Sequence, residues 1–307
     1  MIAIVCPGQG SQTPGFLSPW LELDGTRALL ESLSDAAGVD LVRHGTESDE
    51  ETIKDTAVAQ PLIVAAGLVA AAALEADAAA PASTLVAGHS VGEITAAAVT
   101  GVLSPADALA LVRVRATGMA RAAAATPTGM AAVVGGDQDE VLAAIEAADL
   151  APANVNGAGQ IVAAGTAEAL AALGESAPAR ARVIPLKVAG AFHTEHMRPA
   201  VEELAAHVAG LSPADPRLTL LSNRDGQAVD AGAEVLSRIV DQVTRPVRWD
   251  LCMEAMAERE VTGVLELLPG GTLTGLAKRG LKGTAQLAVK TPEDLDAARA
   301  FLAEHTA

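Results

Sequence analysis

The chain has 307 residues, half of them hydrophobic, and carries a formal net charge of −17. This length allows one large domain, or a large domain with a smaller companion, around a sizeable apolar core. Nucleic-acid-binding proteins normally carry a basic balance, so the acidic charge argues against that class. The two cysteines, Cys6 and Cys252, show no CxxC spacing, and we expect buried, reduced thiols rather than a metal or redox site.

The N-terminal residues lack the basic start of a signal peptide, and we therefore expect a cytoplasmic protein. The run 61–74 is strongly apolar but short for a bilayer, and Glu75 and Asp77 follow it closely. This pattern predicts a buried helix rather than a membrane span. The Ala-rich stretch 76–82 is low in complexity but too brief to be a linker.

Three short apolar runs, at 2–6, 84–87 and 264–267, end at or near glycines. Continuous apolar runs of this length are typical of strands buried on both faces of a parallel sheet. Helical patterns lie between and after them, at 91–101, 105–125, 199–210 and 249–260. Strands that alternate with helices predict an α/β fold with a parallel sheet covered on both faces.

The segment 128–188 has a different pattern, and we interpret it as an inserted small domain. Its helices are expected to begin near Asp137 and after Thr166, which is a good N-terminal cap. Extended runs are expected at 130–134, 153–156, 161–164 and 182–188. The order β-α-β-β-α-β is the ferredoxin-like arrangement. Residues 1–127 and 189–307 would then form one discontinuous catalytic domain.

The sequence Gly88-His89-Ser90-Val91-Gly92 fits the G-x-S-x-G nucleophile elbow, with an apolar strand before it and a helix after it. Small residues allow the sharp turn that exposes a serine hydroxyl, and the following helix directs backbone N–H groups at the same point. The motif alone is common, and an incidental serine in a tight turn is the alternative. The flanking elements favour a catalytic Ser90.

A catalytic serine needs a base, and the six histidines differ in context. His89 is next to the serine, so its ring should point away from the hydroxyl. His193 follows a stretch of small residues that would let its ring approach another backbone, and His196 lies about one turn later. We favour His193 and keep His196 as the alternative. The H-x-x-H spacing has no third ligand, so no metal is expected.

Several motifs spread over nearly the whole chain resemble the malonyl-CoA:acyl carrier protein transacylase family. They comprise Pro7-Gly8-Gln9-Gly10-Ser11-Gln12, the elbow with Glu93, Arg113-Val114-Arg115, Asn154-Val155-Asn156, Gly190-Ala191-Phe192-His193 and Pro246-Val247-Arg248-Trp249. The resemblance implies an α/β-hydrolase-like parallel-sheet core with an inserted ferredoxin-like small domain. It also implies that Ser90 is the acylated nucleophile and that His193 is its base.

The same resemblance implies roles for other residues. The backbone N–H groups of Gln9 and Val91 would form the oxyanion hole. A backbone carbonyl at Arg248 would orient the histidine, although well-known members carry Gln at the position that we match to it. Asn156 would lie near the active site. Each of these roles comes from the family and not from the spacing of the residues.

Arg115 is the residue on which substrate choice depends. From the sequence alone, a surface arginine is the favoured interpretation. By resemblance it pairs with the free carboxylate of malonate, which the guanidinium fork suits better than an ammonium would. In related acyltransferases a Phe before the histidine, here Phe192, accompanies malonyl, and a Ser accompanies methylmalonyl.

The resemblance implies malonyl-CoA and an acyl carrier protein as partners, with no metal or redox cofactor. Because the carrier protein is usually acidic, we expect a local basic patch near Ser90, with candidates Arg180, Arg182, Lys187, Lys278, Arg279 and Lys282. Two rivals remain at this point: a hydrolase on the same core, and an inactive module that only docks carrier proteins. A role in polyketide synthesis would use the same chemistry.

Overall fold

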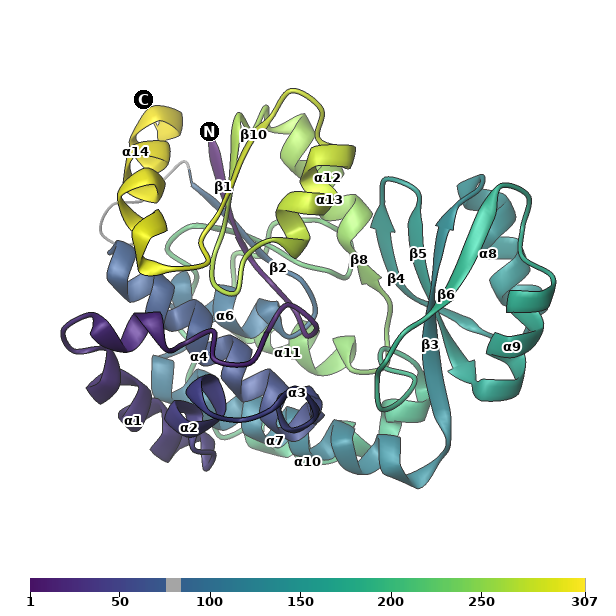
Figure 1. Ribbon diagram of the computed structural model, residues 1–307, viewed down its shortest axis with the longest axis horizontal. Coiled ribbons are helices and arrows are strands. Elements are labelled where there is room, and N and C mark those ends of the chain that lie inside the picture. The colour runs from purple at the N-terminus through teal and green to yellow at the C-terminus, as the bar shows by residue number, and fades with distance from the viewer. Residues whose placement is uncertain (76–83, 307) are drawn as a thin grey trace.

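The computed structural model describes residues 1–75 and 84–306, so the whole of the low-complexity stretch 76–82 lies outside the described residues. Two five-stranded sheets organise the chain (Figure 1). The first sheet is parallel throughout and has the order β10-β9-β1-β2-β7. Its strands are β1 (Ile2–Cys6), β2 (Leu85–Gly88), β7 (Thr219–Leu221), β9 (Gly263–Glu266) and β10 (Ala285–Ala288). The predicted parallel sheet is confirmed.

The central strand β1 explains why the apolar runs are continuous. Ile2 and Ile4 pack into one apolar cluster with helices α1, α4, α6 and α7, whereas Ala3 and Val5 pack into another with α12 and α13. Both faces of the sheet are therefore covered, and no residue of β1 faces water. In register, Ile4 lies opposite Val86 of β2 and Leu265 of β9.

The helices of the larger unit include one very apolar element, α4 (Thr56–Leu74), which packs against α6 (Gly92–Val99) and α7 (Pro105–Ala125). By length and composition α4 could cross a membrane, yet 72% of its apolar window is buried inside the protein. The predicted buried helix is therefore confirmed. The remaining helices are η1 (Pro19–Glu22), α1 (Thr26–Ala37), α2 (Leu41–Thr46), α3 (Glu50–Lys54), η2 (Glu195–Ala200), α10 (Val201–Val208), α11 (Gly232–Gln242), α12 (Trp249–Glu258), α13 (Thr272–Gly280), η3 (Pro292–Asp294) and α14 (Leu295–Thr306).

The second sheet has the order β6-β3-β5-β4-β8 and lies beside the larger unit (Figure 1). Four of its strands come from the inserted segment: β3 (Thr128–Gly135), β4 (Ala151–Gly157), β5 (Gln160–Thr166) and β6 (Ala181–Pro185). Helices α8 (Gln138–Ala147) and α9 (Ala167–Glu175) cover the face turned away from the larger unit. Thr166 caps α9 by accepting the Ala169 N–H, as predicted. The ferredoxin-like arrangement is confirmed.

One strand of the second sheet was not predicted. The two-residue strand β8 (Val247–Arg248) pairs in parallel with β4, with Val247 opposite Asn154. The larger unit thus donates a strand to the smaller one, which fixes β4 against the segment that leads into α12. The domain boundaries at 127/128 and 188/189 stay predictions.

Candidate active site

Ser90 stands in the sharp turn between β2 and α6. Its φ is 55°, in the left-handed region that a residue with a Cβ rarely adopts. The turn is held to the first sheet by the His89 N–H, which donates to the Cys6 carbonyl at 3.0 Å. This strained strand-to-helix corner is the geometry of a nucleophile elbow.

Two glycines of the motif are required by close backbone contacts rather than by their φ angles. A Cβ on Gly88 would lie 2.1 Å from the carbonyl carbon of Gly92, and a Cβ on Gly92 would lie 2.2 Å from the Cys6 carbonyl oxygen. Gly8, just before Gln9, also lies against the elbow, because a Cβ on Gly8 would lie 2.8 Å from the His89 carbonyl oxygen. The loop after β1 therefore lies directly against the elbow.

His193 is the histidine that meets the serine. Its Nε2 lies 2.7 Å from Ser90 Oγ, and its Nδ1 lies 2.8 Å from the backbone carbonyl oxygen of Gln242. A carbonyl can only accept, so Nδ1 carries the hydrogen and Nε2 is left to accept the serine proton. His193 also has a positive φ, 61°, and is 4% exposed. Two strained residues thus face each other across the site.

The predicted orienting residue, Arg248, is wrong, because the carbonyl on His193 belongs to Gln242. Gln242 is the last residue of α11, and the last carbonyls of a helix have no intrahelical donor. Arg248 instead lies in β8, donates its N–H to Asn223 O at 2.8 Å and forms an ion pair with Asp250. The Gln242 carbonyl also accepts the Arg245 N–H at 3.2 Å, in the turn that ends the helix. A helix end ahead of Pro246 was the sequence signal that could have indicated the right segment.

The surroundings of His193 keep its ring neutral. Burial, and next the charge of Arg115, lower the pKa of the His193 imidazole to about 3. At neutral pH the ring therefore holds a single proton, on Nδ1, and can accept another at Nε2. A serine hydroxyl bonded to a neutral imidazole is the standard arrangement for generating a nucleophilic alkoxide.

The oxyanion-hole role expected of Val91 and Gln9 stays a prediction, but both residues lie close to Ser90. Val91 directly precedes α6, and Gln9 lines the same cavity as Ser90. Within the part of the chain that the structure describes, neither backbone N–H donates to a protein acceptor. The Gln9 side chain donates from Nε2 to the Lys54 carbonyl oxygen at 3.4 Å.

Arg115 is not a surface residue, because its side chain on α7 is fully buried. Its Nη1 donates to Gln60 Oε1 at 2.7 Å and its Nη2 to Gln242 Oε1 at 2.8 Å. Its Nε is buried and has no acceptor among the described residues. Burial lowers the pKa of the Arg115 guanidinium to about 10, so it remains charged at neutral pH.

The cavity beside Ser90 has a volume of about 650 Å³, which suits an extended small-molecule ligand. Both units contribute to its wall: the elbow and the loop after β1 on one side, and strands β3, β4 and β5 on the other. Phe192 and Asn156 line it, as does Gln60, the neutral partner of Arg115. The Gln60 amide therefore lies between the buried guanidinium and the cavity.

His89 and Asn156 form a separate pair on this wall. Asn156 Oδ1 accepts from His89 Nε2 at 2.9 Å, and Asn156 Nδ2 donates to Gln160 Oε1 at 2.9 Å. The His89 ring contacts Trp249 edge-on, with centroids 5.6 Å apart. His89 Nε2 is thus bonded to Asn156, and it is His193 that bonds to the serine hydroxyl.

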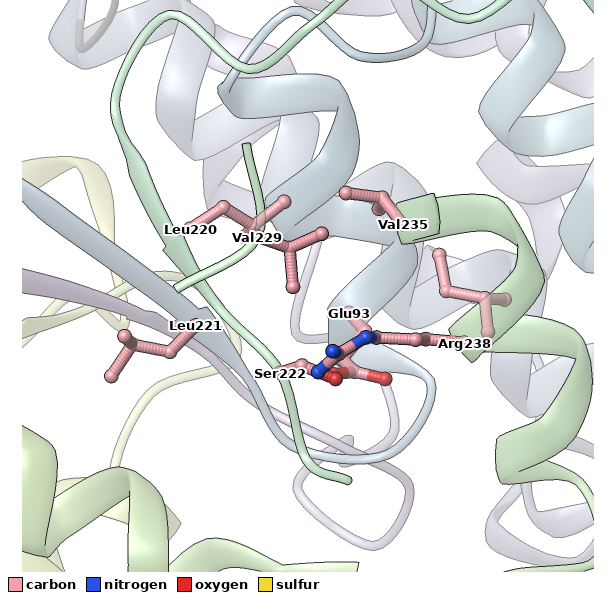
Figure 2. A pocket seen from close by; sticks show the side chains of 8 residues that line it. Glu93, Leu220, Leu221, Ser222, Val229, Val235 and Arg238 are labelled. Carbon is pink, nitrogen blue, oxygen red and sulfur yellow. The ribbon is translucent and has the colours of Figure 1, made fainter. Parts of the chain in front are cut away.

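Three polar residues lie under the elbow: Asn223 and Gln242, which the sequence did not indicate, and Glu93, which belongs to the elbow motif but had no expected role. Asn223 donates from Nδ2 to Gly88 O at 2.7 Å and accepts the Ser90 N–H on Oδ1 at 2.8 Å. Glu93 accepts the Asn223 N–H at 2.6 Å, and Gln242 Nε2 donates to the same carboxylate. Burial raises the pKa of the Glu93 carboxyl to about 7. Figure 2 shows Glu93 beside the Arg238 guanidinium, next to the strand end at Leu221 and Ser222.

Among the described residues, no group of three or more His, Cys, Asp or Glu side chains could hold a metal ion. The polar groups next to Ser90 include the imidazole of His193 and the carboxamides of Asn223 and Gln242, and the Glu93 carboxyl and the Arg115 guanidinium bond to Gln242 behind them. Such a set supports acyl transfer through a serine ester.

Comparison with known proteins agrees with this arrangement. A family model described as an acyl transferase domain matches residues 3–306. The curated malonyl CoA-acyl carrier protein transacylase of Mycobacterium tuberculosis is 54% identical over 297 residues, which cover 96% of this chain and 98% of that protein. The chain belongs to the malonyl CoA-acyl carrier protein transacylase family.

Other members of the transacylase family agree in sequence and structure. The Escherichia coli relative is 32% identical and covers 96% of this chain. The crystal structure of the Mycobacterium tuberculosis enzyme superimposes with a TM-score of 0.94 and covers 97% of this chain and 99% of its own. A malonyl-transacylase solved with its type II polyketide synthase acyl-carrier protein has a TM-score of 0.91 at 30% identity, over 97% of this chain and 99% of its own.

The elbow contacts predict that Gly92→Ala destabilises the fold. The new Cβ would meet the backbone oxygen of Cys6, which cannot move without disturbing β1. We expect a loss of about 1–3 kcal/mol in the free energy of unfolding, measured by urea denaturation. Gly174→Ala in α9 is the control, because nothing lies within 4 Å of its added Cβ. Equal stability of the two variants would contradict this account of the elbow.

The environment of His193 predicts that its imidazole does not titrate between pH 8 and 5 in the folded protein. The folded pKa is about 3 and the unfolded value about 6.5, so the neutral ring stabilises the fold above pH 6.5. That contribution is lost as the pH falls from 6.5 towards 3. NMR of the assigned ring measures this directly, with the urea-unfolded chain as the control. A step for folded His193 near pH 6.5 would rule the prediction out.

Proposed function

We propose that this protein transfers a malonyl group from malonyl-CoA, through an ester on Ser90, to the phosphopantetheine thiol of an acyl carrier protein. The observation that carries the proposal is the 2.7 Å contact between Ser90 Oγ and His193 Nε2, set beside a buried arginine whose hydrogen-bond partners are both neutral. The names of the relatives support the same substrate and acceptor. We propose a cytoplasmic site of action in fatty-acid synthesis, or in polyketide synthesis, where the chemistry is the same.

In the first half-reaction, His193 Nε2 takes the Ser90 proton as Oγ attacks the thioester carbonyl. The tetrahedral oxyanion is stabilised by the backbone N–H groups of Val91 and Gln9, which have no protein acceptor among the described residues. When the intermediate collapses, the imidazolium returns its proton to the departing CoA sulfur. The product is a malonyl ester on Ser90, and His193 is neutral again.

In the second half-reaction, the carrier's thiol enters the position that CoA has left. His193 takes the thiol proton, the thiolate attacks the ester carbonyl, and the proton passes to Ser90 Oγ as it leaves. One base serves both steps, and its low pKa returns it to the neutral form each time. The chemistry needs no metal or redox cofactor.

Selection of a dicarboxylic acyl group is assigned to Arg115. The guanidinium is fully buried, and its hydrogen-bond partners are the amides of Gln60 and Gln242. A carboxylate that displaces the Gln60 oxygen would satisfy the charge, and two parallel N–H···O bonds would fix its orientation. Phe192 supplies bulk on the cavity wall, where an added methyl on the substrate would be crowded.

A hydrolase on this scaffold would orient its histidine with an acid. Here the orienting group is a backbone carbonyl, which favours the transferase over that rival. The docking-only alternative conflicts with an aligned serine and histidine.

For the acidic carrier, Lys187 and Lys54 line the cavity, and we propose that they belong to the basic patch at its mouth.

The serine–histidine contact predicts the outcome of three substitutions. Ser90→Ala should abolish formation of the malonyl-enzyme, and His193→Ala should slow both half-reactions by about 10²–10⁴-fold. His196→Ala is the matched control, because His193 rather than His196 contacts the serine. Intact-protein mass spectrometry after rapid mixing with malonyl-CoA measures the acylation. A normal rate in His193→Ala together with a slow rate in His196→Ala would reverse the assignment.

The buried guanidinium predicts the substrate preference. Acetyl-CoA would leave Arg115 without its anion, so the wild type should favour malonyl by up to about 10⁴-fold. Arg115→Ala should depress malonyl transfer and narrow this gap. Phe192→Ser should raise methylmalonyl relative to malonyl, but only within the range of about 1–3 kcal/mol that one methyl allows. Competition between pairs of CoA esters measures all three ratios, and an unchanged malonyl preference in Arg115→Ala would refute the role of the arginine.

A further inference from the structure

Gln242 bonds to Ser90, His193 and Arg115, although only its backbone carbonyl is needed to orient His193. Any amino acid would supply that carbonyl. The side chain, which is 5% exposed, turns inward from the end of α11. Its Oε1 accepts from Arg115 Nη2 at 2.8 Å, and its Nε2 donates to Ser90 O at 3.1 Å and to the Glu93 carboxylate.

We propose that the Gln242 side chain is a positioning residue that couples the carboxylate-binding guanidinium of Arg115 to the Ser90–His193 pair. The inference rests on the proposed function, since it concerns how that site selects its acyl group. One carboxamide holds the guanidinium at one end and the strained Ser90 backbone at the other. The separation between the Arg115 guanidinium and Ser90 is thereby fixed. It sets the distance that a substrate must have between its carboxylate and its reacting carbonyl.

The chemistry of the carboxamide is suited to this coupling. A glutamate of the same size would form an ion pair with Arg115 and compete with the substrate's carboxylate. A carboxamide oxygen orients the guanidinium and leaves its charge uncompensated. The other hydrogen-bond partner of Arg115, Gln60, is also a neutral amide. The third nitrogen of the Arg115 guanidinium, Nε, has no acceptor among the described residues, so its N–H remains for an incoming anion.

Asn223 holds the Ser90 elbow as Gln242 does, but it does not hold Arg115. It holds the same elbow, through Gly88 O and the Ser90 N–H, but makes no hydrogen bond with Arg115 among the described residues. Asn223 Oδ1 also accepts from Gln242 Nε2 at 3.3 Å, whereas the bond to Arg115 is made by Gln242 Oε1. A substitution at Asn223 that adds no charge should therefore act on the serine more than on the guanidinium. The residue is the control for the position of the nucleophile.

The test compares acylation by malonyl-CoA and acetyl-CoA in the same preparation, so that the ratio of rates does not depend on the fraction of active enzyme. Gln242→Met should lower the acetyl rate, because Ser90 loses a hydrogen bond. It should lower the malonyl rate further and reduce the malonyl-to-acetyl ratio by about 10–100-fold, the effect of one hydrogen bond to a charged group. Asn223→Ala, which adds no charge near Arg115, should lower both rates and change the ratio far less than Gln242→Met does.

A double substitution decides whether the effect on selectivity passes through Arg115. In an Arg115→Ala background, adding Gln242→Met should leave the malonyl-to-acetyl ratio where Arg115→Ala alone puts it. If Gln242→Met does not accumulate as folded protein, Gln242→Asn, which shortens the same carboxamide, carries the same expectations. A proportional loss of both rates, with an unchanged ratio, would overturn the coupling. A wild-type protein without malonyl preference would instead refute the proposed function.

Discussion

The positive charge of Arg115 is buried in the protein core, and much of the site is arranged around it. A buried guanidinium is costly unless it is hydrogen-bonded and compensated. Here two carboxamides provide the hydrogen bonds, and Glu93 provides a nearby carboxyl that does not bond to it directly. Burial raises the pKa of Glu93 to about 7, so that carboxyl is only partly ionised at neutral pH. The compensation is therefore incomplete until an anion enters.

The same charge also acts on the base. Burial is the larger cause of the low pKa of His193, and the Arg115 guanidinium is the next. The cation that we propose to hold a substrate carboxylate thus also helps to keep the imidazole unprotonated. Binding of an anion would offset that charge and raise the pKa of His193, which makes the ring a stronger base when a dicarboxylic substrate is present. Recognition and base strength are linked through one electrostatic interaction.

The strain at the site needs a rigid support. Ser90 and His193 both have φ near 60°, which costs on the order of 1–3 kcal/mol each for residues with a Cβ. Asn223 bonds to the elbow on either side of His89, and Gln242 bonds to the Ser90 carbonyl with its side chain and to His193 with its backbone. These partners are buried, so the strained geometry is held in the absence of substrate.

The sequence predicted well those helices and strands whose ends are set by neighbouring residues in the chain. The helix at 105–125 has the predicted bounds, because Ser104 caps it and Pro105 suits its first turn. β7, with three residues, and β8, with two, were too short to show a pattern. Gln60, Asn223 and Gln242 were missed for another reason. Each is a single polar residue in an ordinary helix or loop, and its partner lies 55 or more residues away.

The group that orients His193 is the neutral backbone carbonyl of Gln242, and its lack of charge has a consequence for the site. An aspartate or glutamate bonded to His193 Nδ1 would stabilise the imidazolium more strongly than a carbonyl does. In this site the orienting residue is also the residue that holds Arg115, so a carboxylate there would lie next to the guanidinium and neutralise it. The role that we propose for Arg115 requires that charge to remain uncompensated by the protein. On that proposal, a histidine oriented by a helix-end carbonyl is a consequence of placing a dicarboxylate site within the reach of the serine and the histidine.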